Sequence, residues 1–492
     1  MCMNRLLYPL IFICLLNGVG YCQPSDAVYA SSQTNGNPHA GISSASVDNP
    51  QNAITNTISN TTDASFTKPN AKFTTLKATA LSTLTGSASA WIQLAFVSTP
   101  TDAVVPANTT VYVKATTTAA GLLGLVGGAG LTFTAYSTNT GTANPVTIAA
   151  APKIYYTADG NIYFAVKPTA NFKSIRITLA AGAVLGDGSV DIYYAFYGPG
   201  ATNDTNPFPF NVADCGLPNV DETESSGAVT LASFVSPGSA IDNSLTSATA
   251  FSITASIAGT MKQTFYFNGL SNAGDAVRII FSKGSASALA SIDIGSSLTI
   301  QAFNGAAFVG TATPFNELLS LNLLSSTLLG TSTNSITAYL TPKDAGGNPA
   351  VFDRVVVTFN VTASLLGSLL SGSANGFNIF DVRRVPIAPA SSNITACTNI
   401  GIATLAASTT QSTIQNIGSF TYKWYSVLAG GSGTGGQNLA LTGLTAVGQS
   451  SYYVDIQKSG CESSSTGSPS SRTKVTVNVV NPPVTPSVAL TP

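Results

Sequence analysis

The chain contains the same series of sequence landmarks twice. The central segment LTFTAYSTNTGTA begins at Leu131, and its counterpart LTIQAFNGAAFVGTA begins at Leu298. An Asp-Asn step precedes each segment, and a β-branched run follows each (SIRITL from Ser174, RVVVTF from Arg354). The separation of the copies changes from 194 residues at the Asp-Asn step (242 minus 48) to 167 at the central segment (298 minus 131), as expected where strands are retained and loops vary. The duplication predicts two domains of one fold.

The segments between turn signals have the pattern of β-strands. They are short, rich in β-branched and aromatic residues, and separated by Gly, Pro, Asn and Asp. No helical period appears between them, which favours an all-β fold. We expect two jelly-roll-like β-sandwiches, at residues 26–212 and 214–388. The expected strands are AWIQLAFV (90–97), TVYVKAT (110–116), NIYFAVK (161–167) and VDIYYAFY (190–197) in the first copy, and QTFYFNG (263–269), AVRIIFSK (276–283), SITAYLT (335–341) and GFNIFDVRRV (376–385) in the second.

Charged residues are unusually scarce. They make up 8% of the 492 residues, against about 25% in ordinary soluble domains, while the hydrophobic content is an ordinary 44%. The polar surface must therefore consist mainly of Ser, Thr, Asn and Gly. The net charge of −1 provides no attraction to nucleic acid or to an anionic membrane, so neither is expected as a partner.

A secretory signal peptide is predicted at residues 1–22. An arginine is followed by an apolar run of eleven residues (6–16) and by small residues before a cleavage point at Gln23. Such a run is too short for a membrane span, which takes about 20 residues. We expect a secreted or cell-surface protein. Lipidation of Cys22 is the alternative, which the bulky residue before it disfavours.

A third unit is predicted at residues 393–480, after a Pro/Ala/Ser linker. It contains Cys397, a strand TYKWYS with Trp424, and a Tyr-rich strand SYYVDIQKSGC that ends at Cys461. Two cysteines around a central-strand tryptophan are typical of an immunoglobulin-like (Ig-like) sandwich. The Pro-rich segment 481–492 is expected to be an extended linker toward further modules of a longer chain.

The order of KWY, a glycine-rich hairpin, YYV and GC in this unit resembles the Ig-like modules of secreted and surface proteins of Bacteroidota bacteria. The two preceding copies resemble, more loosely, the galactose-binding-like jelly-roll domains that accompany such modules. The resemblance covers about 90 residues of the Ig-like unit. It implies an adhesin-like protein at the cell surface.

The cysteines of the mature chain are few. Cys397 and Cys461 are expected to form a disulfide that closes a loop of about 64 residues, with a stabilisation of about 4 kcal/mol in an oxidising compartment. Cys215, between the two copies, has no obvious partner. It is either a buried unpaired residue or a link between two chains.

The residues argue against catalysis. His39 is the only histidine, so a Ser-His-Asp triad or a zinc site lacks its ligands. A glycosidase needs two carboxylates, but Asp191 of the first copy corresponds to Asn378 of the second, and only Asp48 and Asp242 recur. We predict no catalytic residue and do not expect an enzyme.

The recurring pairs Asp48-Asn49 and Asp242-Asn243 are the most informative polar residues. Their side-chain oxygens suit Ca²⁺, which takes six to eight oxygen ligands. The favoured interpretation is a turn or cap in which the carboxylate accepts backbone N–H bonds. No certain metal site and no other cofactor is expected.

Aromatic residues are the candidate contacts for a saccharide. Trp91 and Trp424 are the only tryptophans, and their places in strands favour core packing for both. Tyr193, Tyr194 and Tyr197 occur in one strand, IYYAFY, whose side chains alternate between two faces. At least one of these tyrosines is expected to face solvent and to be available to a ligand.

These observations favour a non-catalytic secreted or cell-surface protein for adhesion or matrix attachment. Its partner would be an extracellular glycan or a surface protein, because a polar surface with few charges suits both. Two alternatives remain. One is an array of carbohydrate-binding modules, and the other is a structural spacer or filament subunit that self-associates through exposed strand edges.

Overall fold

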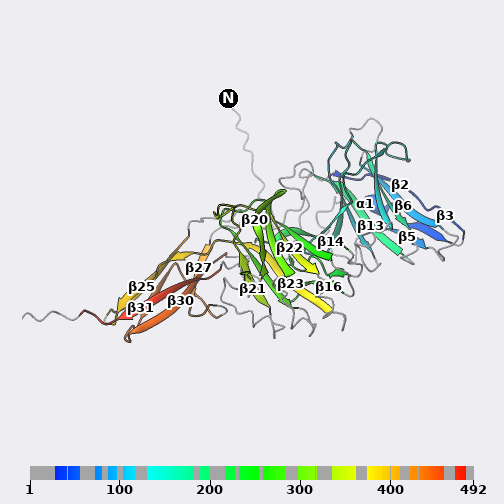
Figure 1. Ribbon diagram of the computed structural model, residues 1–492. Coiled ribbons are helices and arrows are strands. Elements are labelled where there is room, and N and C mark those ends of the chain that lie inside the picture. Colours follow the sequence, from blue (N-terminus) through cyan, green and yellow to red (C-terminus); the bar gives the residue numbers. More distant parts are fainter. Residues whose placement is uncertain are drawn as a thin grey trace, which may run out of the picture.

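The computed structural model of the protein describes residues 28–41, 43–55, 72–79, 87–96, 104–117, 130–181, 188–198, 216–227, 232–253, 259–267, 269–283, 297–315, 317–318, 335–361, 374–398, 400–409, 420–428, 431–458 and 471–483. Within these residues the chain forms mainly β-strands, with a helical turn, α1 (Asn52–Thr55). The fold is all-β, with tandem β-sandwiches (Figure 1). The prediction of the fold class is confirmed.

The first sandwich is built from two sheets that face each other. The strands are β1 (Val28–Tyr29), β2 (Ser32–Gly36), β3 (His39–Ala40), β4 (Ser44–Asp48), β5 (Thr74–Thr79), β6 (Ser87–Ala95), β7 (Val111–Thr117), β8 (Leu131–Tyr136), β9 (Pro145–Val146), β10 (Lys153–Tyr156), β11 (Ile162–Val166), β12 (Ser174–Ala180) and β13 (Gly188–Tyr197). One sheet runs β4-β5-β13-β7-β11-β10, and the other runs β2-β6-β12-β8-β9.

The second sandwich repeats this strand order. Its strands are β14 (Pro218–Gly227), β15 (Ala232–Val235), β16 (Thr249–Ile253), β17 (Gly259–Phe267), β18 (Ala276–Lys283), β19 (Leu298–Asn304), β20 (Ala307–Pro314), β21 (Ile336–Leu340), β22 (Arg354–Val361) and β23 (Ala374–Val385). The sheets run β15-β16-β23-β18-β21 and β14-β17-β22-β19-β20. The twin sequence segments occupy equivalent places, β8 with β19 and β12 with β22.

A β-bulge recurs at the same position of both copies. In β13 the register shifts between Ile192 and Tyr194, which leaves Tyr193 as the extra residue. In β23 the shift leaves Phe380 as the extra residue, because Ile379 and Asp381 pair with neighbouring residues of β18. The aligned strands VDIYYAFY and FNIFDVRR place Phe380 opposite Tyr193. The two copies therefore share this irregularity as well as the strand order.

The two sandwiches share one sheet. Strand β14 of the second copy pairs with β17 and also with β10 of the first copy, through the pairs Tyr155 with Glu222 and Tyr156 with Asp221. This pairing, called the seam below, joins sheets of both copies into one sheet of 12 strands, in the order β20-β19-β22-β17-β14-β10-β11-β7-β13-β5-β4 with β1 beside β13. The duplication predicted two sandwiches but not this continuity.

Each sandwich has its own hydrophobic core, and an aromatic cluster covers part of the opposite face of the shared sheet. Tyr156 belongs to the first core and is paired with Asp221, whose side chain points into the second sandwich. Because paired residues point to the same face, both cores lie on one side of the 12-stranded sheet. The aromatic cluster on the other side consists of Tyr112, Tyr155, Tyr163, Tyr193, Tyr194, Phe196 and Tyr266.

The third sandwich has the Ig-like features expected from its sequence. Trp424 is 2% exposed in its core and donates a hydrogen bond from Nε1 to the carbonyl of Gly436 (3.1 Å), so core packing of this tryptophan is confirmed. The strands are β24 (Ala390–Ser391), β25 (Ile394–Cys397), β26 (Ile402–Ser408), β27 (Phe420–Tyr425), β28 (Thr434–Gly435), β29 (Asn438–Thr442), β30 (Gly448–Lys458) and β31 (Thr473–Val480), in sheets ordered β24-β26-β29 and β25-β31-β30-β27-β28.

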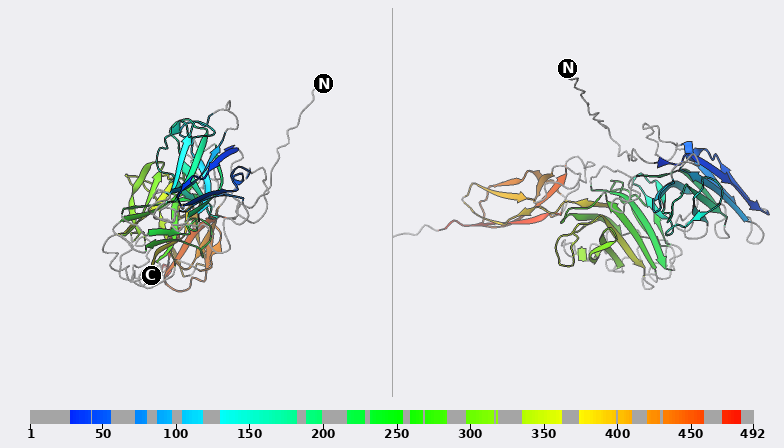
Figure 2. Two further views of the ribbon diagram at one scale, coloured as in Figure 1. Left: turned by 90° about the vertical axis from the view of Figure 1, so that its right-hand side faces the viewer. Right: turned by 90° about the horizontal axis from the view of Figure 1, so that it is seen from above.

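The three sandwiches lie in a row, with the Ig-like unit at one end and the first copy at the other (Figure 1). The same row is seen from above in Figure 2. In the part of the chain that the structure describes, no helix has the length and apolar character needed to cross a membrane.

Candidate functional site

The outer face of the sheet β2-β6-β12-β8-β9 carries an unusual group of side chains. Alternation along β6 and β12 sends residues such as Ile92 and Ile177 into the core. The alternate residues of the same strands, Trp91, Gln93 and Arg176, therefore point to the outside. Arg176 pairs with Gln93, and Thr178, two residues further along β12, pairs with Trp91. We call the group Gly36, Trp91, Gln93, Tyr136 and Arg176 the Trp91 face.

Arg176 lies flat on aromatic rings. Its guanidinium carbon is 3.8 Å from the centroid of the Trp91 ring and 5.2 Å from that of Tyr136. The other side of the indole rests on Gly36 of β2, where an added Cβ atom would lie 2.7 Å from the ring. Only glycine leaves room for the tryptophan at this place. The stacked arginine adds a cation–π attraction of about 0.5–1 kcal/mol at such a half-exposed position.

Gln93 holds Arg176 in place. The Gln93 side chain is fully buried, and its Oε1 accepts hydrogen bonds from Nε (3.1 Å) and Nη2 (2.7 Å) of Arg176. Its Nε2 donates to Oγ of Ser174 (2.7 Å), which donates in turn to the carbonyl of Thr138 (2.7 Å). This chain of bonds orients the amide so that its oxygen points at the arginine. The guanidinium is thereby positioned before any ligand arrives.

The Trp91 face can recognise a polar ligand. Arg176 is half-exposed, and within the described ranges no carboxylate forms an ion pair with it. An aromatic ring and a cation on one face are groups that can bind polyhydroxylated molecules.

The expectation that Trp91 packs in the core is wrong. The side chain is half-buried on the outer face, and it shares this face with Gln93 rather than with the apolar residues of β6. The alternation in AWIQLA already contained the signal, because Trp91 is in phase with a glutamine whereas Ile92 is in phase with Leu94. The stacking of Arg176 could not be read from this pattern, since the arginine lies more than 80 residues away.

The Trp91 face is not duplicated. In the second copy, Lys262 takes the position of Trp91 and pairs with Thr358. Thr264 takes the position of Gln93 and pairs with Val356. The counterpart of Arg176 is therefore a valine. The two copies share a backbone but differ in the chemistry of this face, which makes Lys262 a matched control position for Trp91.

Two of the three tyrosines predicted to contact a ligand are buried. Tyr193 and Tyr194 are each 4% exposed in the aromatic cluster, and Tyr197 is half-buried against Phe96 (5.4 Å between ring centroids). The bulge at Tyr193 interrupts the alternation, so Tyr193 and Tyr194 lie on the same face of the sheet, opposite the core, where the aromatic cluster buries them. Tyr197 keeps part of its side chain exposed, and contact of these tyrosines with a ligand stays a prediction.

Both Asp-Asn steps form turns. Asn49 and Asn243 have positive φ angles of 53° and 63°, a left-handed conformation that asparagine tolerates better than most residues. In the second copy, Asp242 accepts bonds from the Ser244 backbone N–H (2.8 Å) and the Ser247 hydroxyl (2.5 Å). In the first copy, Asp48 instead accepts a bond from Lys77 (2.7 Å), which lowers the pKa of the aspartate.

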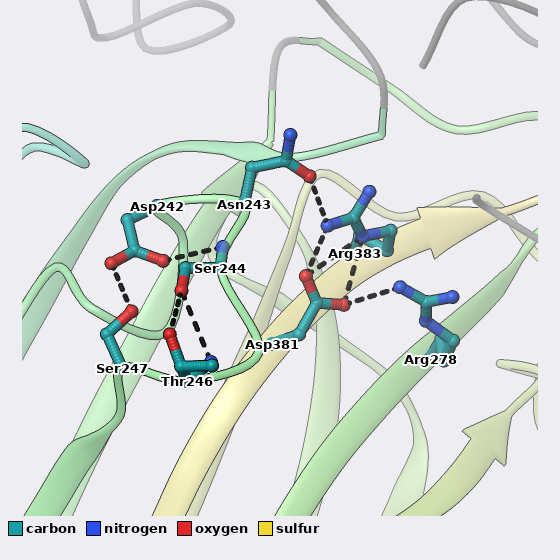
Figure 3. A network of polar contacts seen from close by, with 8 residues as sticks. All are labelled: Asp242, Asn243, Ser244, Thr246, Ser247, Arg278, Asp381 and Arg383. Carbon is teal, nitrogen blue, oxygen red and sulfur yellow. Dashed lines mark hydrogen bonds and ion pairs between the residues drawn. The ribbon is translucent and has the colours of Figure 1, made fainter. Parts of the chain in front are cut away.

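The second turn is tied to a buried charge cluster (Figure 3). Asn243 Oδ1 accepts a hydrogen bond from Arg383 Nη2 (2.8 Å), and both Arg383 and Arg278 form ion pairs with Asp381. Burial acts to raise the pKa of Asp381, but the charges and hydrogen bonds of Arg383 and Arg278 outweigh it, and the pKa is lowered. The aspartate is therefore ionised, and the cluster consists of two cations around one anion.

The first copy has aromatic residues where the second has these charges. The alignment of β13 with β23 sets Tyr194 opposite Asp381 and Phe196 opposite Arg383. Tyr112, the partner of Phe196 in the sheet, corresponds in pairing to Arg278, the partner of Arg383. Equivalent positions thus carry packed aromatic residues in the first copy and an ion cluster in the second. This exchange argues that the ion cluster has a structural role.

Removal of calcium is expected to leave the thermal midpoint of the protein unchanged. Among the described residues, no group of three or more His, Cys, Asp and Glu side chains is arranged to hold a metal. The carboxylates of Asp48 and Asp242 already accept bonds from Lys77, Ser244 and Ser247. Calorimetry in EDTA and in added calcium tests this expectation. A midpoint that rises by several degrees with calcium would restore the calcium interpretation of the turns.

The remaining candidate residues do not form a site. His39 is exposed on β3. Cys397 is half-buried on β25 without a disulfide to any described residue, and Cys461 and Cys215 lie outside the described residues. The pairing of Cys397 with Cys461 therefore remains a prediction.

Some solved structures are similar to this chain, but no protein family is identified for it. No protein-family model matches the chain, and no curated protein matches it. Solved structures with some similarity include a β-1,2-glucanase from Parabacteroides distasonis (8% identity, TM-score 0.23, covering 53% of this chain and 37% of that chain) and allantoicase from Saccharomyces cerevisiae (7% identity, TM-score 0.21, covering 61% and 76%). Another is the tandem CBM22-1–CBM22-2 domain of Paenibacillus barcinonensis Xyn10C (9% identity, TM-score 0.17, covering 75% and 99%). The match thus spans little more than a third of the glucanase chain. Scores this low carry no argument about activity or ligand.

Proposed function

We propose that this is a non-catalytic, exported attachment protein that holds a glycan-binding surface away from the cell. The observation that carries the proposal is the continuous 12-stranded sheet. Main-chain hydrogen bonds across the seam join the two sandwiches more stiffly than a flexible linker would. A stiff body is suited to presenting a surface at a distance from its anchor.

The scarcity of charge supports the same proposal. With 8% charged residues, the protein can approach a neutral or weakly charged extracellular surface without strong repulsion. The proposal includes export through the predicted signal peptide at residues 1–22, the three predicted domains (26–212, 214–388 and 393–480) and the disulfide between Cys397 and Cys461.

The Trp91 face favours glycan binding over a pure spacer role. A spacer requires no preorganised cation, whereas Arg176 is held flat on Trp91 and fixed by a buried glutamine. Carbohydrate-binding modules work through such aromatic surfaces, so the protein would act as an adhesin through a module-like contact. The filament alternative remains a separate proposal that requires association without a ligand.

Replacement of Trp91 by alanine is expected to abolish glycan binding while Lys262→Ala leaves it intact. Both substitutions affect positions that are equivalent in the pairing of the two copies, so Lys262→Ala controls for a change at this place in the sheet. The measurement is a glycan-array screen of the purified full chain, with light scattering on the same samples. Binding that survives Trp91→Ala would contradict the proposed contact. Concentration-dependent assembly without any glycan signal would favour the filament alternative.

A further inference from the structure

We propose that the Trp91 face selects saccharides that carry a carboxylate, with Arg176 as the partner of that group. The inference rests on the proposed glycan-binding function and names the class of ligand. Three features of the site support it: the charge of Arg176, the direction of its donors and the neutrality of the residue that holds it.

Arg176 differs from the other arginines in its lack of an acidic neighbour. Among the described arginines, Arg278, Arg354, Arg383 and Arg472 each form an ion pair with an aspartate. Arg384 is fully buried and donates to the carbonyl of Gly269 (3.2 Å). Arg176 alone is half-exposed and bonded only to neutral oxygens, those of Gln93 and Gly141. Its charge is therefore available to an anion from outside.

The donors of Arg176 are divided between the protein and the solvent side. Nε and Nη2 are directed at Gln93 Oε1, and Nη2 also reaches the carbonyl of Gly141 (3.4 Å). Among the described residues, no hydrogen bond uses Nη1 of Arg176. An arginine presents planar donors that match a carboxylate, and a charge-assisted bond of this kind is about twice as strong as a neutral one. A hydroxyl group of a neutral sugar would gain less from the same atom.

Gln93 provides the geometry of an ion pair without cancelling the charge. A glutamate at this position could accept the same two hydrogen bonds from Arg176, but it would neutralise the guanidinium inside the protein. The buried amide holds the arginine and leaves its full positive charge at the surface. Such an arrangement is of use only where the charge must act on something else.

The decisive variant is therefore Gln93→Glu. It is nearly isosteric and is expected to preserve the stacking of Arg176 on Trp91, while it removes the net charge of the face. The experiment uses calorimetric titration of the full chain with an acidic oligosaccharide, such as an oligogalacturonide, and with the methyl ester of the same oligosaccharide. We expect the ester to bind at least about tenfold more weakly than the acid, and Gln93→Glu to bind the acid at least about tenfold more weakly than the wild type.

Each outcome has a definite meaning. Equal binding of acid and ester, with no effect of Gln93→Glu, would overturn the selection of carboxylates and leave the glycan-binding function standing. Binding of no saccharide, acidic or neutral, would overturn both proposals. Thermal melting of each variant shows whether the fold is retained, and Arg176→Gln serves as a second variant that removes the charge from the other partner of the pair.

Discussion

Replacing Asp221 by asparagine is expected to remove most of the loss of stability that the protein undergoes between about pH 5 and about pH 8. Asp221 lies at the seam, where it is fully buried. Its Oδ2 accepts bonds from the backbone N–H of Gly238 (3.1 Å) and from Nε2 of Gln263. Burial raises the pKa of Asp221 to about 7, although these hydrogen bonds lower it in part.

The sign of the effect follows from the direction of this shift. The carboxyl has a pKa of 3.8 in the unfolded chain and about 7 in the folded protein, so the folded state binds the proton more tightly. Its contribution is fully present below the unfolded pKa and is lost as the pH rises through the folded pKa. A difference of about three pKa units corresponds to about 4 kcal/mol of unfolding free energy.

Asparagine imitates the protonated acid at this position. Asp221 Oδ1 and Gln263 Oε1 have no hydrogen-bond partner in the structure, and both are acceptors unless the carboxyl carries its proton. We expect the proton of Asp221 to supply the missing donor, and the amide of asparagine to supply it at every pH. Tyr156, which faces Asp221 from β10, has its pKa raised to about 12 by burial and stays neutral in this range.

Scanning calorimetry across this pH range measures the effect. Infrared difference spectra add a second readout, because the C=O band of a protonated carboxyl should be present in the wild type near pH 6 and weaker in Asp221→Asn. Asp48→Asn is the control, since Asp48 is exposed and its pKa is lowered by Lys77 rather than raised. The buried Asp455, whose pKa is raised to about 6, leaves some residual slope. An unchanged pH profile of Asp221→Asn would show that Asp221 is already ionised.

Replacing Asp381 by alanine is expected to cost about 3–5 kcal/mol of unfolding free energy, because it leaves Arg278 and Arg383 as two buried cations without their anion. The side chains of all three residues are at most 3% exposed. Chemical denaturation with fluorescence detection measures the loss. The control is Ser247→Ala, which removes a hydrogen bond to Asp242 in the same network without leaving a buried charge.

The residues of the first copy suggest a variant that removes all three charges of the cluster, whereas Asp381→Ala leaves two cations without their anion. The triple variant Arg278→Tyr, Asp381→Tyr and Arg383→Phe reproduces the residues of the first copy, where Tyr112 and Phe196 stack with 5.5 Å between ring centroids. Replacement of a buried ion cluster by packed apolar residues is often neutral or stabilising. We expect the triple variant to recover most of the stability lost in Asp381→Ala. A triple variant less stable than Asp381→Ala would show that the charges themselves stabilise the second sandwich.

The repeated strand pattern could be read from the sequence because it is a local property. Alternation, turn residues and the twin segments at Leu131 and Leu298 are contained in short stretches, and these stretches became β8 and β19 at equivalent places in the two sandwiches. The core position of Trp424 followed from the same kind of pattern. The turn at each Asp-Asn step was also the favoured interpretation, since asparagine accepts a left-handed conformation.

The candidate site was less accessible to the same reasoning. At least one tyrosine of β13 was expected to face solvent because strict alternation was assumed, but the bulge at Tyr193 breaks that alternation and places Tyr193 and Tyr194 together in the aromatic cluster. Trp91 was assigned to the core from its place in an alternating strand, although its phase along β6 is shared with Gln93. Both strands exist as expected: for Trp91 the error lies in the face of the strand, and for Tyr193 and Tyr194 it lies in the aromatic packing that buries the face opposite the core. A shift of one residue is enough to exchange the two faces.

Sequence alone therefore established the all-β class, the duplication and the places of most strands, because these depend on the order of neighbouring residues. The seam between β10 and β14 and the stacking of Arg176 on Trp91 depend on how distant strands are brought together. The seam is made by backbone N–H and C=O groups, which every residue carries, so no particular residue type marks it in advance. The Trp91 face arises because pairing in register places Arg176 beside Gln93 across two strands, a relation that exists only once the sheet has formed.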